Sequence, residues 1–483
     1  MGRTSLRCVS SPPRFFAGRG FAEDDHPGSP FAVKKFLMLL FFAVAVVFSV
    51  SAGNSPKYIF LFIGDGMSVP QRMMADEFAR MRGDGQLAMN TLPFHATTRT
   101  CSASSLVTDS AAAATAIACG VKTLNGKMGV DPQDRRLESV AEAAKKSGRK
   151  VGIVTSVTIN HATPAGFYAH RSHRSQGYAI GLDLIDSGFD YFAGGGFGKY
   201  ADDKTAPEYK GSLYELAAKA GYKVVSTKAG LMALRPGCGK VLARGCEGAL
   251  PYELDGGDNA TLSEFTAKGI ELLDNPAGFF MMVEGGSIDW CGHSNDAAAN
   301  LAEVIGLDRA VRVALAFAAK NPGETLIVVT GDHETGGMTM GFAGTGYKFY
   351  MERLANQKCS VDAFAGKLRE RRGTKAGFRF EDAKKMLRES FGFEFEGEGT
   401  MVLSAEEVEQ LKRGFETPPG DKGDPLAAAA RIVMSGKAGV GWTSGAHTAL
   451  PVLTTSIGRG AERFTGFFDN TDIAKRLKEI IWE

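Results

Sequence analysis

The sequence has little net charge and few cysteines. Its 56 Lys and Arg residues against 54 Asp and Glu leave a formal charge of +2 over 483 residues. A wide basic surface that would hold nucleic-acid phosphates is therefore not expected, and we predict no nucleic-acid partner. The seven cysteines show no C-x-x-C pattern of the kind that binds zinc. With 44% hydrophobic and 23% charged residues, the composition is otherwise that of a globular protein.

The apolar run Phe36 to Val50 is too short to span a bilayer comfortably. It has 15 residues, whereas a spanning helix needs about 20. Lys34 and Lys35 precede it and the small residues Ser51 and Ala52 follow, which is typical of a secretory signal peptide. We therefore interpret residues 1–52 as an upstream segment with a signal peptide, and expect export to the periplasm or the outside of the cell. An uncleaved membrane anchor is the alternative.

An exported protein can oxidise its cysteines, of which six follow Cys8. Cys238 and Cys246 could close a short loop. They could equally stay free or pair elsewhere, because connectivity cannot be deduced from the sequence alone.

Four short apolar runs predict buried parallel strands, and helical patterns lie between them. Strands that alternate with helices predict an α/β fold, with a central, mostly parallel sheet flanked by helices. The predicted strands are Tyr58–Ile63, Lys150–Thr155, Gly278–Val283 and Thr325–Val329, and the helices include Leu137–Ser147, Leu262–Asp274 and Asn295–Lys320.

Residues 345–440 break this alternation. They are rich in Glu, Lys, Arg, Phe and Gly, with an amphipathic helix expected at Ser404–Arg413. We predict that they form an inserted cap region, and that residues 53–344 and 441–483 together form the main domain.

Acidic residues, imidazoles and a threonine follow the predicted strands. Because open α/β sheets bind ligands at the carboxyl ends of their strands, we expect these side chains to share one edge of the sheet. Carboxylates and imidazoles at this density suit zinc, and the remaining carboxylate and hydroxyl oxygens suit magnesium. The residues concerned are Asp65, His161, Thr163, Glu284, Asp289, His293, Asp332 and His333.

The spacing of these residues adds detail. Asp289 and His293 are four apart, so on a helical turn both side chains reach one ion from the same face. Asp332 and His333 are adjacent and can serve one ion only where the backbone bends, which the neighbouring glycines allow. His447 lies far downstream in GAHT and is a weak signal by itself.

Ser110 is the candidate nucleophile. It opens an alanine-rich run and should stand at a helix N-terminus, where free N–H groups and the helix dipole favour an anion. A plain N-cap serine is the alternative. No G-x-S-x-G elbow precedes Ser110, but a zinc ion in contact with the hydroxyl would lower its pKa without a histidine base.

Six motifs resemble those of alkaline phosphatases. They occur in the family's order from about residue 58 to 470 and together are highly specific. The motifs are GDGM, TDSAAAATA, HATPAGFYAHR followed by Arg174, VEGGSIDWCGH, TGDHETGG and GAHT.

The resemblance implies an exported phosphate monoesterase with two zinc ions and one magnesium ion, and a homodimer. Ser110 is then the nucleophile that becomes phosphoserine, and Arg174 the guanidinium that holds two phosphate oxygens. The implied ligands are Asp289, His293 and His447 for the first zinc, Asp65, Asp332, His333 and Ser110 for the second, and Thr163, Glu284 and the shared Asp65 for magnesium, with His161 close by.

The chain departs from the family's best-known patterns near the third metal. It has His161 and Trp290, where the best-known bacterial member has an acid and a lysine and the animal enzymes have two histidines. Trp290 is not a metal ligand, so phosphate affinity, magnesium affinity and pH optimum stay open. The segment 345–440 occupies the place of the crown domain of the animal enzymes.

Three other functions compete with that of a phosphate monoesterase. A sulfatase-like Ser-x-Pro-x-Arg string, residues 10–14, lies before the export signal and follows no strand. A phosphodiesterase of the same superfamily is a stronger rival. Arg174 argues against it, because a diester has one non-bridging oxygen fewer than a monoester and so lacks the second free oxygen pair that a bidentate grip rewards. The third is a metal-binding or phosphate-binding surface protein without turnover.

Overall fold

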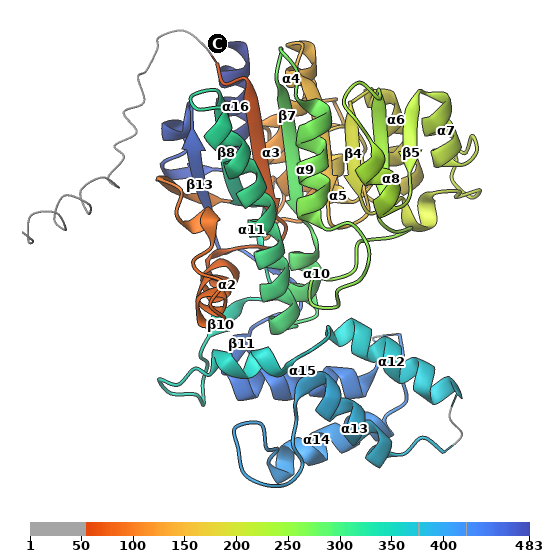
Figure 1. Cartoon of the computed structure of the whole chain (residues 1–483), viewed down its shortest axis with the longest axis vertical. Coiled ribbons are helices and arrows are strands. Elements are labelled where there is room, and N and C mark those ends of the chain that lie inside the picture. The colour runs from red at the N-terminus through yellow and green to blue at the C-terminus, as the bar shows by residue number, and fades with distance from the viewer. Residues whose placement is uncertain (1–54, 375–376, 422) are drawn as a thin grey trace, which may run out of the picture. The chain divides into compact units, whose positions relative to one another are not determined.

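The computed structural model describes residues 55–374, 377–421 and 423–483, so the predicted signal peptide lies outside the described residues. Within this part of the chain, ten strands form the central sheet in the order β14-β2-β13-β8-β1-β7-β3-β4-β6-β5 (Figure 1). Of these ten, β13 alone runs antiparallel to its neighbours. The predicted α/β fold with a mostly parallel sheet is confirmed. The strands are β1 (Tyr58–Gly64), β2 (Phe94–Arg99), β3 (Lys150–Thr155), β4 (Tyr191–Gly194), β5 (Tyr222–Val225), β6 (Lys240–Arg244), β7 (Phe279–Gly285), β8 (Thr325–Gly331), β13 (Val452–Gly458) and β14 (Gly466–Asp469).

The four predicted strands are β1, β3, β7 and β8, which are neighbours at the centre of the sheet. Their near-continuous apolar sequences follow from burial on both faces. In β1, Tyr58, Phe60 and Phe62 enter one core, and the alternate residues 59, 61 and 63 enter the other. Gly64 is paired with both Gly285 and Gly331, so three strands end at the same level.

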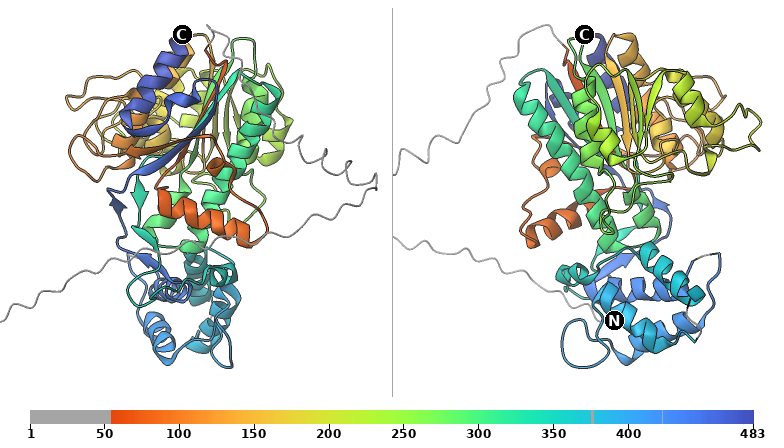
Figure 2. Two further views of the ribbon diagram at one scale, coloured as in Figure 1. Left: turned by 90° about the vertical axis from the view of Figure 1, so that its left-hand side faces the viewer. Right: turned by 45° about the vertical axis from the view of Figure 1, so that its right-hand side comes forward.

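Helices cover both faces of the sheet (Figure 2). One face carries α2 (Val69–Met81), α9 (Leu262–Leu273) and α11 (Ala297–Lys320). The other carries α3 (Ser110–Cys119), α4 (Val140–Lys146) and α16 (Thr471–Trp482). The predicted helices are α4, α9 and α11, each within three residues of its expected bounds. The other helices outside residues 345–440 are α5 (Ala162–Ala165), α6 (Gly177–Ser187), α7 (Leu213–Lys219), α8 (Lys228–Ala233), α10 (Ser287–His293), η1 (Ala88–Asn90), η2 (Gly198–Tyr200) and η4 (Ala461–Arg463).

The segment 345–440 is helical where it is described. Its helix α14 (Ala405–Glu416) is the one predicted from the sequence, and it begins with a capping box at Ser404. At the base of the segment, Asp296, the N-cap of α11, accepts hydrogen bonds from Gln357 Nε2 and from the Val361 backbone N–H. The division into a main domain and an inserted cap stays a prediction. The other helices here are η3 (Met351–Asn356), α12 (Val361–Thr374), α13 (Phe380–Phe391) and α15 (Pro425–Ala438).

Two short antiparallel pairs bring the flanks of this segment together. β9 (Glu334–Thr335) pairs with β12 (His447–Thr448), and β10 (Met338–Met340) pairs with β11 (Val440–Trp442). These pairs place residues from the end of the chain beside the carboxyl end of β8.

The six cysteines of the described residues are free thiols. Cys238 precedes β6 and Cys246 follows it, so a five-residue extended strand lies between them. At about 3.3 Å per residue that strand is far longer than the ~7 Å limit between the Cα atoms of a disulfide. The structure therefore excludes the short loop that these two cysteines could have closed.

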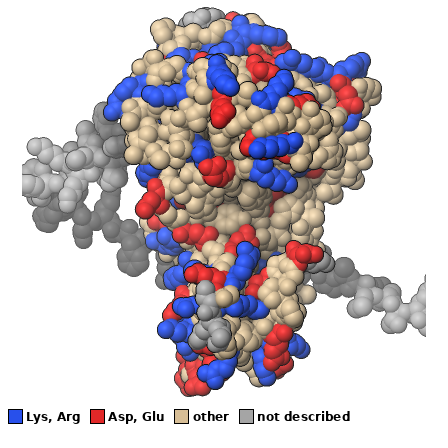
Figure 3. All heavy atoms as spheres, turned by 90° about the vertical axis from the view of Figure 1, so that its right-hand side faces the viewer, with Lys and Arg blue, Asp and Glu red and all other residues tan. Residues whose placement is uncertain are grey.

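Charged side chains of both signs are interspersed over the face shown in Figure 3. Ion pairs of the described residues include Arg171 with Asp183 and Arg309 with Glu253. In the described residues, we find no helix that is both long and apolar enough to cross a membrane.

Candidate metal centre and nucleophile

Three groups of ligand side chains cluster at the carboxyl ends of β1, β7 and β8. Each group has three residues whose ligand atoms lie within 4.8 Å of one another, and these are the groups of acidic and imidazole ligands found in the described residues. They are Asp289 with His293 and His447, Asp65 with Asp332 and His333, and Asp65 with His161 and Glu284. The edge predicted from the sequence therefore brings together all of the predicted carboxylate and imidazole ligands.

In the group of Asp289, His293 and His447, a backbone carbonyl fixes the orientation of each imidazole. Asp289 and His293 lie on one face of α10, as their spacing predicts. His293 Nδ1 bonds the Gly445 carbonyl and His447 Nδ1 the Thr108 carbonyl, each at 2.8 Å. In these bonds each Nδ1 donates its proton to a carbonyl oxygen. The opposite ring nitrogens, the two Nε2 atoms, face Asp289, and each lies 3.4 Å from one of its carboxylate oxygens. A backbone carbonyl on the far nitrogen is the usual partner of a metal-binding histidine.

His447 reaches this group through the β9–β12 pair. His447 is paired with Thr335, and its ring stacks on His333 with the centroids 3.7 Å apart. The buried carboxylate of Glu334 joins the two strands, because it accepts hydrogen bonds from Thr448 Oγ1 and from Gln71 Nε2 of α2.

The second group surrounds Ser110. His333 Nε2 lies 3.3 Å from both Asp65 Oδ1 and Asp332 Oδ2. Ser110 Oγ is 3.1 Å from His333 Nε2 and 3.5 Å from Asp65 Oδ1. The hydroxyl therefore shares the space between the same ligand atoms that could hold a cation.

The third group shares Asp65. Thr163 of α5 donates from Oγ1 to Asp65 Oδ2 at 3.0 Å, and Thr155 Oγ1 donates to Glu284 Oε2. His161 lies beside Glu284 and Asp65, and its ring meets that of Trp290 edge to face, with centroids 5.9 Å apart. Burial, followed by the charge of Arg174, lowers the pKa of His161 to about 4.

The electrostatics of the second and third groups favour bound cations. Burial raises the pKa of Glu284 to about 8 and that of Asp332 to about 7, and repulsion between the neighbouring carboxylates adds to it. Burial and the same repulsion raise the pKa of Asp65 well above its ordinary value. Glu284 Oε1 and Asp332 Oδ2 are buried and have no hydrogen-bond partner in the described residues. Buried carboxylates that lack donors are costly unless paired or bound to metal, so the donor set fits divalent cations.

In the first group, the two imidazoles lower the pKa of the carboxylate, in contrast to the raised values of the other two groups. Burial acts to raise the pKa of Asp289, but hydrogen bonds from His293 and His447 outweigh it and hold the pKa well below its ordinary value. The hydrogen bond to Asp289 raises the pKa of His293 to about 9. A cation at these atoms would take the place of the shared protons.

Ser110 is the first residue of α3 and is buried. The N-cap is Asp109, whose side chain accepts from the Ala112 N–H at 3.0 Å. The alternative of a plain N-cap serine is therefore wrong. Capping by Asp109 leaves the Ser110 hydroxyl free to face the ligand groups.

Arg174 contacts Asp109, the residue before Ser110, and is held by two side chains. Its NH1 donates to Asp109 Oδ2 at 3.1 Å and its NH2 to His161 Nε2 at 3.2 Å. Its side chain keeps 30% of its surface exposed. Asp109 thus connects the start of α3 to the guanidinium.

Several residues at the site were not predicted from the sequence. Thr335 donates from Oγ1 to Asp289 Oδ1 at 2.5 Å, and Asp109, Thr155 and Glu334 make the contacts given above. Threonine and aspartate near strand and helix ends usually serve as caps, so the sequence offers no distinct signal for these contacts.

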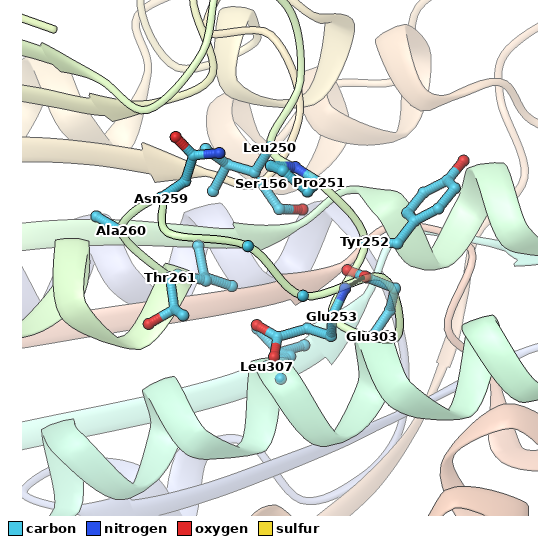
Figure 4. Close-up of a pocket in the computed structure, with 14 residues that line it drawn as sticks. Ser156, Leu250, Pro251, Tyr252, Glu253, Asn259, Ala260, Thr261, Glu303 and Leu307 are labelled. Atoms are coloured by element: carbon cyan, nitrogen blue, oxygen red, sulfur yellow. Dashed lines mark hydrogen bonds between the residues drawn. The ribbon is translucent and has the colours of Figure 1, made fainter. Parts of the chain in front are cut away.

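A separate cavity of about 70 Å³ lies next to the end of β3 (Figure 4). Glu303 of α11 and Glu253 of the loop between β6 and α9 line it, and Glu303 is 5% exposed. Glu303 Oε1 accepts one hydrogen bond, from the Glu253 backbone N–H. The cavity contains no member of the three ligand groups.

Comparison with known proteins agrees with this geometry. The family model described as alkaline phosphatase matches residues 56–482. The chain belongs to the alkaline phosphatase family. Alkaline phosphatase 4 of Bacillus subtilis (strain 168) is 32% identical over 386 residues, covering 78% of this chain and 77% of that relative. The family's curated relatives are named alkaline phosphatases, which are phosphoric monoester hydrolases.

Solved alkaline phosphatases share the fold. The cold-active enzyme from Shewanella sp. is 29% identical, covers 88% of this chain and 99% of its own, and gives a TM-score of 0.76. A mutant of the alkaline phosphatase from the bacterium TAB5, described as having Mg bound in the M3 site, is 25% identical, with 89% and 99% covered and a TM-score of 0.63.

Proposed function

We propose that this member of the alkaline phosphatase family hydrolyses phosphate monoesters through a phosphoserine at Ser110. The observation that carries the proposal is the position of Ser110 Oγ, which is buried at the start of α3 and lies 3.1 Å from His333 Nε2. The preceding residue, Asp109, binds Arg174. The free N–H groups of the helix start and the guanidinium both favour an anion at this point.

The three ligand groups would hold two zinc ions and one magnesium ion. We assign the first zinc to Asp289, His293 and His447, the second to Asp65, Asp332, His333 and Ser110, and magnesium to Asp65, Thr163 and Glu284. Bound there, such cations lower the pKa of hydroxyl groups and of water and neutralise charge that develops on phosphoryl oxygens.

The chain's own residues complete the reaction. Ser110 Oγ bonds to phosphorus as the bond to the alcohol oxygen breaks, and the alcohol leaves with a proton. Water then bonds to phosphorus as the bond to Ser110 Oγ breaks, which releases phosphate. Two displacements on one phosphorus retain its configuration. Arg174, held by Asp109, offers a planar pair of donors to two phosphoryl oxygens.

The test compares a monoester with a diester. The zinc- and magnesium-loaded protein should hydrolyse para-nitrophenyl phosphate at mildly alkaline pH at least 100-fold faster than the bis-para-nitrophenyl diester. Ser110→Ala should lose at least about 1,000-fold in kcat, because it removes the nucleophile, while its bound zinc, measured by elemental analysis, stays near the wild-type content.

Other outcomes would contradict the proposal. A faster diester rate would assign the protein to phosphodiesterases, and hydrolysis of neither ester would favour a metal-binding or phosphate-binding protein without turnover. Full activity of Ser110→Ala would refute Ser110 as the nucleophile.

We further propose that the protein is exported after removal of residues 1–52, that residues 345–440 form a crown-like insertion, and that the protein is a homodimer. Family resemblance supports the last two proposals. N-terminal sequencing of the secreted protein tests the first, and light scattering at micromolar concentration that found a monomer would exclude the dimer.

A further inference from the structure

Glu334 is a buried carboxylate that belongs to none of the three ligand groups. In the chain it lies between two residues of the site. His333, before it, is a member of the second group, and Thr335, after it, donates to Asp289 of the first group. A buried carboxylate is costly unless it is paired or hydrogen-bonded. The contacts of Glu334 therefore show which parts of the chain it holds in place.

Four donors meet the two oxygens of Glu334. Oε1 accepts from Gln71 Nε2 at 2.6 Å and from the Met338 N–H at 3.1 Å. Oε2 accepts from the Gly337 N–H at 3.0 Å and from Thr448 Oγ1. A carboxylate offers about four lone-pair sites, so these donors use its full capacity. This assigns Glu334 to holding backbone and side chains in place rather than to binding a cation.

The bond from Thr448 to Glu334 anchors the segment that carries His447. His447 and Thr448 form the two-residue strand β12, and the residues on either side of it, Ala446 and Ala449, are exposed. Two-stranded pairs are marginally stable by themselves, and one this short has few hydrogen bonds of its own. The backbone of His447 therefore depends on the bond to a fully buried side chain.

Gln71 of α2 holds the other strand of the pair. Its Nε2 donates both to Glu334 and, at 3.0 Å, to the carbonyl of Thr335. Thr335 is paired with His447 and donates from Oγ1 to Asp289. Glu334 and Gln71 therefore connect both strands of the β9–β12 pair to α2.

We propose that Glu334 is a positioning residue for the group of Asp289, His293 and His447. Through Thr448 it fixes the backbone of His447, so that His447 Nε2 stays beside Asp289. The inference rests on the proposed function, because it takes this group as the first zinc site. Residues that hold a metal ligand in place typically contribute about 10–100-fold to metal affinity. Loss of the bond between Glu334 and Thr448 should therefore weaken zinc binding at this group.

The test measures zinc dissociation constants by competition with a chromophoric chelator, on the metal-free, full-length protein. His447→Ala identifies the zinc of the first group, because that binding step weakens most. Thr448→Val replaces the hydroxyl by a methyl group, whereas Thr448→Ser keeps the donor. We expect Thr448→Val to weaken this step at least about ten-fold, and Thr448→Ser to bind zinc within about two-fold of the wild type.

Glu334→Gln is the second variant. Each carboxylate oxygen of Glu334 accepts from a backbone N–H, so either orientation of the glutamine amide sets its NH₂ group against a backbone donor. This variant should weaken the first zinc as well. Thr266→Val is the matched control, because Thr266 of α9 is buried and donates to the Leu262 carbonyl. It should leave zinc affinity unchanged. The melting temperature of each metal-free variant shows that it is folded.

Thr448→Val protein that binds the first zinc as tightly as the wild type would overturn the proposal. Equal weakening by Thr448→Val and Thr448→Ser, or by Thr448→Val and Thr266→Val, would do so too, as would wild-type protein that binds no zinc at His447. Failure of the proposed function would appear separately. Protein with the expected zinc constants but without Ser110-dependent hydrolysis of para-nitrophenyl phosphate would contradict the hydrolase and leave the role of Glu334 intact.

Discussion

Glu303 illustrates how a single buried carboxylate can set the pH dependence of stability. Burial raises its pKa to about 8, whereas a glutamate in an unfolded chain titrates near 4.3. Between these pH values the folded protein keeps a proton that the unfolded chain releases. The free energy of unfolding therefore falls as the pH rises from about 4.3 to about 8, where the loss is complete.

We predict that Glu303→Gln removes this part of the pH dependence. The amide oxygen can still accept from the Glu253 N–H, and glutamine carries no charge. The variant should be more stable than the wild type by on the order of 2 kcal/mol at pH 8.5, with a difference that shrinks toward pH 5. Thermal denaturation of both proteins from pH 5 to 9 measures it. Glu409→Gln, at an exposed position of α14, is the isosteric control and should follow the wild type.

Single residues were predicted best where they follow a buried strand. Asp65 and Asp332 could be placed at one edge because the apolar runs before them predict parallel strands with aligned ends. Thr335 and Asp109 could not, because their contacts depend on side-chain directions that arise only when distant segments pack. Trp290 was expected to be no ligand, and in the structure it packs against His161.

At the scale of elements, the N-cap of α3 connects Ser110, the proposed nucleophile, to Arg174, the proposed phosphate ligand. Asp109 accepts from the Ala112 N–H, from the Gly126 N–H and from Arg174 NH1. We predict that Asp109→Ala costs about 1 kcal/mol of stability and also raises the KM for para-nitrophenyl phosphate about ten-fold, because Arg174 loses an anchor.

The matched control for this change is Asp424→Ala. Asp424 caps α15 through the Leu426 N–H and also lies beside an arginine, Arg372. It should lower the melting temperature by a similar amount and leave KM unchanged. If both variants change KM alike, or neither does, Asp109 has no specific role in positioning Arg174.

The β9–β12 pair could not be predicted from the sequence. From the residues alone His447 was a weak signal, and its role came from family resemblance. The pairing that places it joins Glu334 to Thr448, 114 residues apart. Neither two-residue strand has a periodic pattern, so no local signal predicts either one. The long helices α9 and α11, in contrast, were predicted within three residues because their apolar spacing is sustained.

At the scale of the whole molecule, the ligand groups draw on residues from 65 to 447, so the proposed cations would connect most of the chain. We predict that removal of metals with a chelator lowers the melting temperature by at least about 5 °C, because ions that bind only the folded state stabilise it by mass action. Readdition of zinc and magnesium should restore it. Differential scanning calorimetry with elemental analysis measures both; an unchanged melting temperature in protein shown to be zinc-free would contradict the assignment of these groups as metal ligands.

The late position of β13 in the chain has a consequence for how the protein is made. This strand comes from residues 452–458 yet lies between β2 and β8. Until the ribosome has delivered those residues, β8 has one unpaired edge and β2 has neither of its neighbours, β13 and β14. His447, just before β13, also arrives late. A nascent or truncated chain is therefore open to strand addition by other chains, and its group of Asp289, His293 and His447 is incomplete. Export before folding would keep this vulnerable stage away from the cytoplasm.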